Sequence, residues 1–202
     1  LLANMLEYAK YYAAIKGVAA AGSGDMNVDR RLESIQKLGS TVTDPLVMYM
    51  FAAWKRDRVS CDGLLRMLAD LESYLFRRMI CSVSSNGLNK LVPSLIVRLD
   101  SAEDDLAETF AALLITETAK ATRMPTDSEF RQALLGENLY RPAWRCKYLL
   151  AGLENYNHPK DPRSFSEYTI EHIMPQNAMA HAEWCNMHED RLLPFLCIAA
   201  RG

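Results

Sequence analysis

The stretch SCDGLLRMLADLESYLFRRM, residues 60–79, carries a long helical pattern and predicts the central element of the fold. Ser60 is a residue type that caps helix N-termini, because its hydroxyl accepts a hydrogen bond from a free backbone N–H. The apolar residues then recur at the spacing of one helical face. This expected buried stripe consists of Leu64, Leu65, Leu68, Leu71, Leu75 and Met79. We predict a scaffold helix on which the neighbouring helices pack.

Helical spacing continues on both sides of this stretch, so the fold class is mainly α. Gly39 is a typical C-terminal stop, Asp44-Pro45 is a typical opening turn, and Thr126 with Glu129 forms a capping box. The expected helices cover residues 2–18, a segment around Leu32, Ile35 and Leu38, and residues 44–56, 60–79, 87–99, 101–122, 126–135 and 139–156. We predict one multi-helix domain over residues 1–163.

The pattern changes after residue 156. Residues 157–166 hold two prolines and few apolar side chains, which is typical of a linker. Beyond them the apolar spacing is that of an extended strand, so we place a domain boundary near Ser164. Residues 164–202 are predicted to form a short, incomplete ββα segment.

The run YTIEHIMPQN, residues 168–177, places a carboxylate and an imidazole next to each other in this strand. Adjacent side chains on a strand point to opposite faces, so Glu171 and His172 present a metal ligand and a base on one short segment. Phosphodiester hydrolysis uses both, since a cation stabilises the developing charge and an imidazole deprotonates water. The alternative is that His172 is a hydrogen-bonded structural residue, the commoner role of a lone histidine.

The same run resembles the HNH-like, or His-Me finger, C-terminal domain of the GmrSD-type modification-dependent restriction endonucleases. Upstream stretches resemble the helical middle region of that family. They are residues 73–78 (SYLFRR), 86–90 (NGLNK), 124–130 (MPTDSEF), 147–150 (KYLL) and 153–155 (LEN). The resemblance covers the chain from Tyr8 to Trp184.

This resemblance implies roles for individual residues. His172 is expected to be the general base, with Glu171 at the metal-ligand or orienting position. Pro175 and Asn177 are expected to shape the turn after the strand, and Gln176 to contact phosphate. The expected cofactor is Mg²⁺ or Mn²⁺. The expected partners are DNA, bound through the full-length protein, an N-terminal ParB-like domain of the parent, and a second copy in a homo-oligomer.

The chain departs from the family after Trp184. The family continues with a Gly-Asn-Leu-Thr-Leu stretch and a later asparagine and lysine, and this sequence instead runs RLLPFLCIAARG over residues 191–202. A His-Me finger needs a second strand and a helix to return a further ligand to the metal. We therefore expect a truncated, frameshifted or differently evolved C-terminus that is inactive by itself.

Two further patterns have competing interpretations. Residues 62–66 (DGLLR) match the spacing of a motif in the family's ParB-like half, but they open a leucine-rich helix and are interpreted as structural. His181, Cys185 and His188 are spaced to share one helical face, which with His172 would give a zinc site. The alternative is an ordinary helix anchored by Trp184, and zinc is not the expected cofactor.

Charge and composition limit the function classes. The chain has 202 residues, 50% of them hydrophobic, a net charge of -2 and a pI near 6.1, so the fragment alone is expected to bind DNA poorly. The pairs Arg30-Arg31 and Arg77-Arg78, and the group Arg141, Arg145 and Lys147, are interpreted as solvated helix faces or snorkelling stems.

No sequence feature indicates a membrane or an oxidising compartment. The chain begins Leu1-Leu2, has no run of the ~20 apolar residues that cross a bilayer, and shows no signal peptide. Its five cysteines are odd in number and form no Cys-x-x-Cys pair, so reduced thiols and a cytoplasmic location are expected. They are Cys61, Cys81, Cys146, Cys185 and Cys197.

Three functional hypotheses follow. The first is an enzyme fragment, the helical region and first strand of a GmrSD-like DNA endonuclease. The second is a non-catalytic helical scaffold or interaction domain of a restriction or defence protein, to which the acidic balance is suited. The third is a zinc-stabilised binding module.

Overall fold

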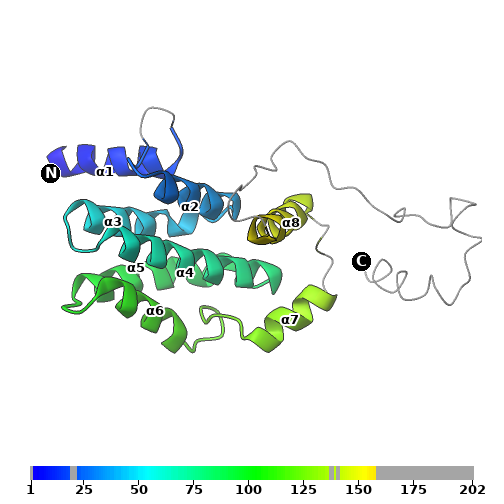
Figure 1. Ribbon diagram of the computed structural model, residues 1–202. Helices are drawn as coiled ribbons and strands as arrows, with labels where there is room; N and C mark the ends of the chain where they lie inside the picture. Colours follow the sequence, from blue (N-terminus) through cyan, green and yellow to red (C-terminus); the bar gives the residue numbers. More distant parts are fainter. Residues whose placement is uncertain (1, 19–21, 137–138, 140–141, 158–202) are drawn as a thin grey trace, which may run out of the picture. The chain divides into compact units, whose positions relative to one another are not determined.

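All regular structure in the described part of the chain is helical, as the apolar spacing predicts. The computed structural model describes residues 2–18, 22–136, 139 and 142–157 (Figure 1). In chain order the helices are α1 (Leu2–Ile15), α2 (Met26–Lys37), η1 (Thr41–Thr43), α3 (Asp44–Lys55), α4 (Cys61–Ile80), η2 (Ser85–Gly87), α5 (Leu88–Asp100), α6 (Leu106–Thr116), α7 (Asp127–Gly136) and α8 (Ala143–Asn157). The mainly α class is confirmed. The ββα segment predicted for residues 164–202 lies outside the described residues.

The chain divides into two compact units, Leu1–Phe130 and Arg131–Gly202. The first unit holds α1 to α6 and the first turn of α7, and α8 belongs to the second. The boundary predicted between residues 163 and 164 lies outside the described residues and stays a prediction.

Side-chain caps set several helix starts. The carboxylate of Asp25 accepts hydrogen bonds from the backbone N–H groups of Asn27 and Val28, and the Ser60 hydroxyl accepts one from Gly63. Asp25 is stabilised as an anion by these two N–H groups, which lower the pKa of its carboxyl. Pro45 stands in the first turn of α3, where its missing N–H costs nothing. The predicted starts at Ser60 and at Asp44-Pro45 are therefore confirmed.

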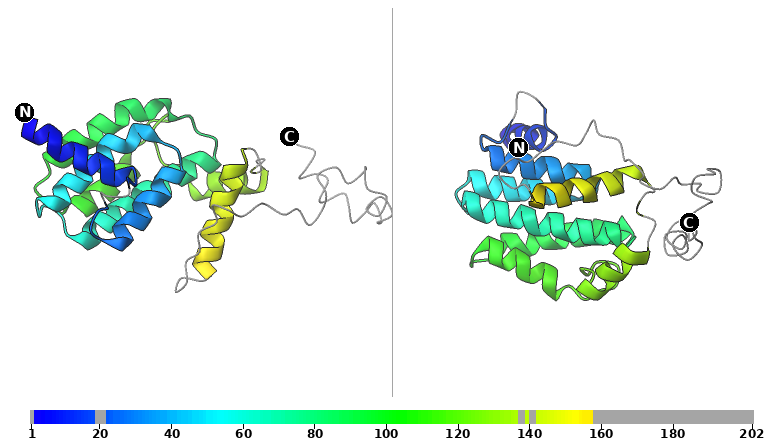
Figure 2. Two further views of the ribbon diagram at one scale, coloured as in Figure 1. Left: turned by 90° about the horizontal axis from the view of Figure 1, so that it is seen from above. Right: turned by 45° about the vertical axis from the view of Figure 1, so that its right-hand side comes forward.

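Helix α4 is the central element of the first unit. It contacts α2, α3 and α6, while α1 lies at the edge beside α2 and α3 (Figures 1 and 2). Because helices approach α4 from several sides, its buried face is wider than the predicted leucine stripe. Leu65 and Met79 are only partly buried. The residues that are buried on α4 are Gly63, Leu64, Met67, Leu68, Leu71, Tyr74, Leu75, Arg78 and Ile80.

The core of the first unit is apolar and closely packed around α4. Its largest fully buried side chains are Tyr74, Phe110, Leu46, Met50, Leu64, Met67, Leu68, Leu71, Ile80, Leu95, Leu99 and Leu114. Burial of each such side chain stabilises the fold by roughly 1.5–3 kcal/mol before the entropy cost of ordering it. All of these residues belong to the four helices α3 to α6.

Two predicted helix spans are wrong at their ends. The helix expected over residues 101–122 covers only Leu106–Thr116, because the Asp105 carboxylate caps the N–H groups of Ala107 and Glu108. It ends where Glu117 takes an extended backbone, with φ -68° and ψ 116°. The helix expected from residue 139 begins at Ala143, directly after Pro142, whose missing N–H suits a helix start better than a helix interior.

The pattern at residues 62–66 is a structural part of α4, as interpreted. A Cβ on Gly63 would lie 2.6 Å from Cγ2 of Val59, so the helix start and the preceding turn are too close for a larger side chain. Glycine is therefore required here by packing.

Two general expectations bear on the described helices. None of them, within the described ranges, is both long and apolar enough to span a bilayer. Among the described residues, Cys61, Cys81 and Cys146 form no disulfide.

Candidate functional site

The residues predicted for catalysis and metal binding lie outside the described residues. They are Glu171, His172, Pro175, Gln176, Asn177, His181, Cys185 and His188. Their roles stay predictions. In the part of the chain that the structure describes, no three His, Cys, Asp or Glu side chains gather in a group that suits a metal ion.

Among the described residues, the candidate polar site surrounds the buried side chain of Arg78, near the C-terminal end of α4. Its side chain is only 3% exposed. Nη2 donates to the carbonyl oxygens of Ser84 at 2.6 Å and Ala121 at 2.9 Å, and Nη1 donates to that of Arg123 at 3.3 Å. Backbone carbonyls thus take the place of water around a buried cation. The interpretation of Arg77-Arg78 as a solvated face is wrong for Arg78.

Tyr74 completes the burial of this guanidinium. Its ring centroid lies 5.3 Å from Cζ of Arg78, within the range of a cation–π contact. Its hydroxyl donates to the carbonyl oxygen of Thr122. Burial raises the pKa of Tyr74 to about 12, so the phenol is held as a neutral donor.

Gly87 allows the loop after α6 to approach this site closely. A Cβ at Gly87 would lie 2.5 Å from the carbonyl oxygen of Ala121 and 3.0 Å from its carbonyl carbon. The same carbonyl accepts a hydrogen bond from Arg78. The absence of a side chain at Gly87 therefore lets Ala121 reach the buried arginine.

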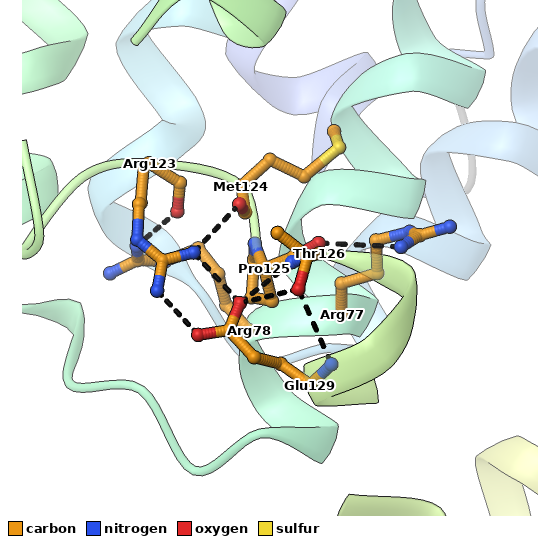
Figure 3. A network of polar contacts seen from close by, with 7 residues as sticks. All are labelled: Arg77, Arg78, Arg123, Met124, Pro125, Thr126 and Glu129. Atoms are coloured by element: carbon orange, nitrogen blue, oxygen red, sulfur yellow. Dashed lines mark hydrogen bonds and ion pairs between the residues drawn. The ribbon is translucent and has the colours of Figure 1, made fainter. Parts of the chain in front are cut away.

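Arg77, the neighbour of Arg78, faces the start of α7. Its Nη1 donates to the carbonyl oxygen of Pro125 at 3.3 Å (Figure 3). The same atom lies 2.6 Å from Oδ1 of Asp127. Cζ of Arg77 lies 5.3 Å from the ring centroid of Phe130, which also makes a T-shaped contact with Phe76. Asp127 is 85% exposed, so this ion pair stabilises the contact by no more than ~1 kcal/mol.

Arg123 and Glu129 fix the first turn of α7 from its own side. The guanidinium of Arg123 contacts both carboxylate oxygens of Glu129 (Figure 3). Oε2 of Glu129 also accepts from the N–H of Thr126 at 2.8 Å, and the Thr126 hydroxyl accepts from the N–H of Glu129 at 3.3 Å. The predicted capping box is confirmed. The Thr126 hydroxyl also donates to Oε2 of Glu129 at 3.0 Å. Hydrogen bonds from Arg123 and from the N–H and hydroxyl of Thr126 lower the pKa of Glu129 to about 2.

We name the set Tyr74, Arg77, Arg78 and Gly87 the α4 clamp, because these residues hold the segment 121–127 through its backbone and the side chain of Asp127. The clamp offers no general base or nucleophile, since its polar groups donate to carbonyl oxygens or pair with a carboxylate. Its arrangement suits the positioning of a chain segment.

The match to a known family begins within this clamped segment. Residues 124–192 match the family described as GmrSD restriction endonucleases, C-terminal domain. Over this stretch the chain is therefore similar to the C-terminal domain of GmrSD-type restriction endonucleases. Searches of curated proteins and of solved structures gave no match.

Sequence reasoning found the segments of the clamp without the contacts between them. Residues 73–78, 86–90 and 124–130 each resemble the family in sequence, and in the structure residues from all three stretches contact the segment 121–130 or belong to it. In the sequence, the buried cation appears only as the pair Arg77-Arg78 after Phe76. A solvated arginine pair on an amphipathic helix has the same pattern, so the sequence does not distinguish the two.

Proposed function

We propose that this chain is the helical region and the first catalytic strand of a GmrSD-like endonuclease that hydrolyses phosphodiester bonds of modified foreign DNA. The observation that carries the proposal is the extent of the family match, residues 124–192, which includes the whole run 168–177. That run holds a carboxylate beside an imidazole, the two groups that metal-assisted hydrolysis uses.

His172 is the proposed general base, which takes a proton from the attacking water. Glu171 supplies a carboxylate oxygen, the type of ligand that Mg²⁺ and Mn²⁺ take. When bound, such a cation would stabilise negative charge that develops on the phosphate. Pro175 and Asn177 shape the turn after the strand, and Gln176 contacts a phosphate oxygen.

We further propose that the chain alone is inactive and that DNA reaches the site through other parts of the parent protein. The sequence after Trp184 lacks the Gly-Asn-Leu-Thr-Leu stretch and the later asparagine that would add a second strand and a further ligand. A net charge of -2 also gives no overall attraction to a phosphate backbone.

The test is metal-dependent nicking of plasmid DNA. The chain and a version with a complete second strand and helix in place of residues 185–202 would each be given plain, hydroxymethylated or glucosylated plasmid with Mg²⁺, Mn²⁺ or a chelator. We expect nicking by the completed version only, with either metal and not with the chelator. A folded completed version that is inert under all conditions would contradict the proposal.

The second candidate is a non-catalytic scaffold that positions the domains of the parent. The α4 clamp favours it, because a well-developed polar site that holds a chain segment in place has a use without any catalysis. The same nicking assay separates the two candidates. An inert completed protein that keeps its clamp would move the scaffold to first place.

A further inference from the structure

The segment that the α4 clamp holds, residues 121–127, overlaps the start of the family-matched region at Met124. The match begins at Met124, yet the first compact unit extends to Phe130. The first residues of the family-matched region are thus part of the helical unit formed by the preceding chain. Contacts within that unit therefore hold the first residues of this region in place.

We propose that Arg78 is the positioning residue that fixes residues 121–130, which include the first residues of the family-matched region, within the helical unit. Its guanidinium joins two segments that are far apart in sequence, since Ser84 follows α4 while Ala121 and Arg123 follow α6. A fork of several N–H donors can bind three carbonyl oxygens at fixed angles. Arg78 therefore holds the loop immediately before Met124 in one position.

The consequences of this position reach the first turn of α7. Arg78 binds the backbone carbonyl oxygen of Arg123. The side chain of Arg123 is then placed to pair with Glu129. Pro125 then contacts Arg77 (Figure 3). Asp127 also contacts Arg77, and Phe130 contacts Phe76. Each contact depends on the loop being in register with α4.

Lysine should not replace Arg78. A lysine ammonium is a compact point charge, whereas the carbonyl oxygens of Ser84, Ala121 and Arg123 are approached by two separate nitrogens of one planar group. Arg78→Lys keeps the charge and loses the geometry. Arg78→Met keeps much of the side-chain length and loses both. Arg66, an exposed arginine of the same helix, provides the matched control Arg66→Met.

The test is hydrogen exchange of the full chain, followed by mass spectrometry of peptides. We expect Arg78→Lys and Arg78→Met to speed exchange in peptides from residues 119–130 by about tenfold or more, through local opening of the loop and the start of α7. Peptides from α2 and α3 should change by less than about twofold. Arg66→Met should leave both groups of peptides as in the wild type.

A merely structural role would give a different pattern. If exchange rises equally across the first unit, Arg78 contributes general stability and the proposal is overturned. It is also overturned if Arg78→Lys is as protected as the wild type at 119–130. Should Arg78→Met not fold, Arg78→Lys and Gly87→Ala decide. The new Cβ at Gly87 would displace the Ala121 carbonyl that Arg78 binds, so Gly87→Ala should give the same local pattern. The readout needs no nuclease activity, so this inference and the proposed function fail separately.

Discussion

Nη1 of Arg123 lies 2.8 Å from Oε2 of Glu129, and Nη2 of the same guanidinium faces Oε1, so the two side chains form a bidentate ion pair six residues apart. This pair closes the first turn of α7 at the start of the family-matched region. Bidentate geometry gives this pair more directional specificity than a single exposed contact.

The Arg123–Glu129 pair predicts a pH dependence. Hydrogen bonds from Arg123 and Thr126 lower the pKa of Glu129 from its ordinary value of 4.5 to about 2 in the folded chain. Its contribution to stability is therefore fully present above pH 4.5 and is lost as the pH falls through about 2.

Thermal unfolding of the wild type and of Glu129→Gln measures this contribution. We expect the wild type to have the higher Tm at pH 7, and the difference to shrink as the pH is lowered from 4.5 toward 2. A Tm difference that does not change over this window would contradict the assignment.

Tyr74→Phe tests the buried hydrogen bond to Thr122. The substitution keeps the ring in the core and removes only the hydroxyl, which leaves the Thr122 carbonyl oxygen without this donor. We expect a loss of about 1–2 kcal/mol in the free energy of unfolding. Chemical denaturation is the measurement, and a variant as stable as the wild type would show that water replaces the phenol.

Gly63→Ala tests whether the start of α4 is closed to a side chain. The new Cβ would lie 2.6 Å from Cγ2 of Val59 and 3.2 Å from Oγ of Ser60. We expect overpacking to cost roughly 1–3 kcal/mol, more than the ~1 kcal/mol that alanine gains in helix propensity. At Gly152 in α8 a Cβ meets nothing within 4 Å, so Gly152→Ala should be neutral or stabilising. Equal effects at the two positions would refute this explanation.

The hydroxyl groups of Ser40 and Thr43 differ in their hydrogen bonding. The buried hydroxyl of Ser40 has no hydrogen-bond partner among the described residues, whereas the Thr43 hydroxyl donates to the Ser40 carbonyl oxygen at 2.9 Å. We expect Ser40→Ala to be neutral or to stabilise the fold by up to ~1 kcal/mol, and Thr43→Val to destabilise it by ~1–2 kcal/mol.

Denaturant midpoints of the two variants give the answer. A destabilising Ser40→Ala would mean that the hydroxyl is bound by water, for which the cavity of about 60 Å³ lined by Ser40 and Gln36 has room.

The helical fold was predictable to the extent that its signals are local. Ser60, Asp44-Pro45 and the pair Thr126 and Glu129 act within one turn of chain, and each marks a helix start in the structure. The C-terminal end of α6 was predicted wrongly because the loop after it is held by contacts from α4, about 45 residues earlier in sequence. Such contacts leave no periodic pattern in the loop itself.

The candidate site shows the same division. Arg78 is buried because carbonyl groups from two other segments bind its guanidinium. The residues next to Arg78 in sequence carry no sign of these partners, so the sequence alone predicts a solvated side chain. Glu171 and His172 are proposed from sequence because their chemistry is carried by residue type and alternation. Their arrangement lies outside the described residues, and their roles stay predictions.

The central claim is that His172 activates water for phosphodiester hydrolysis. Single-turnover nicking of modified plasmid by the completed protein, compared with its His172→Ala variant under the same metal, tests it most directly. We predict a rate lower by about 10²–10⁴-fold in the variant, the usual contribution of a general base, with unfolding midpoints unchanged. If His172→Ala cleaves at the wild-type rate while folded, His172 is not the base and the catalytic account is contradicted.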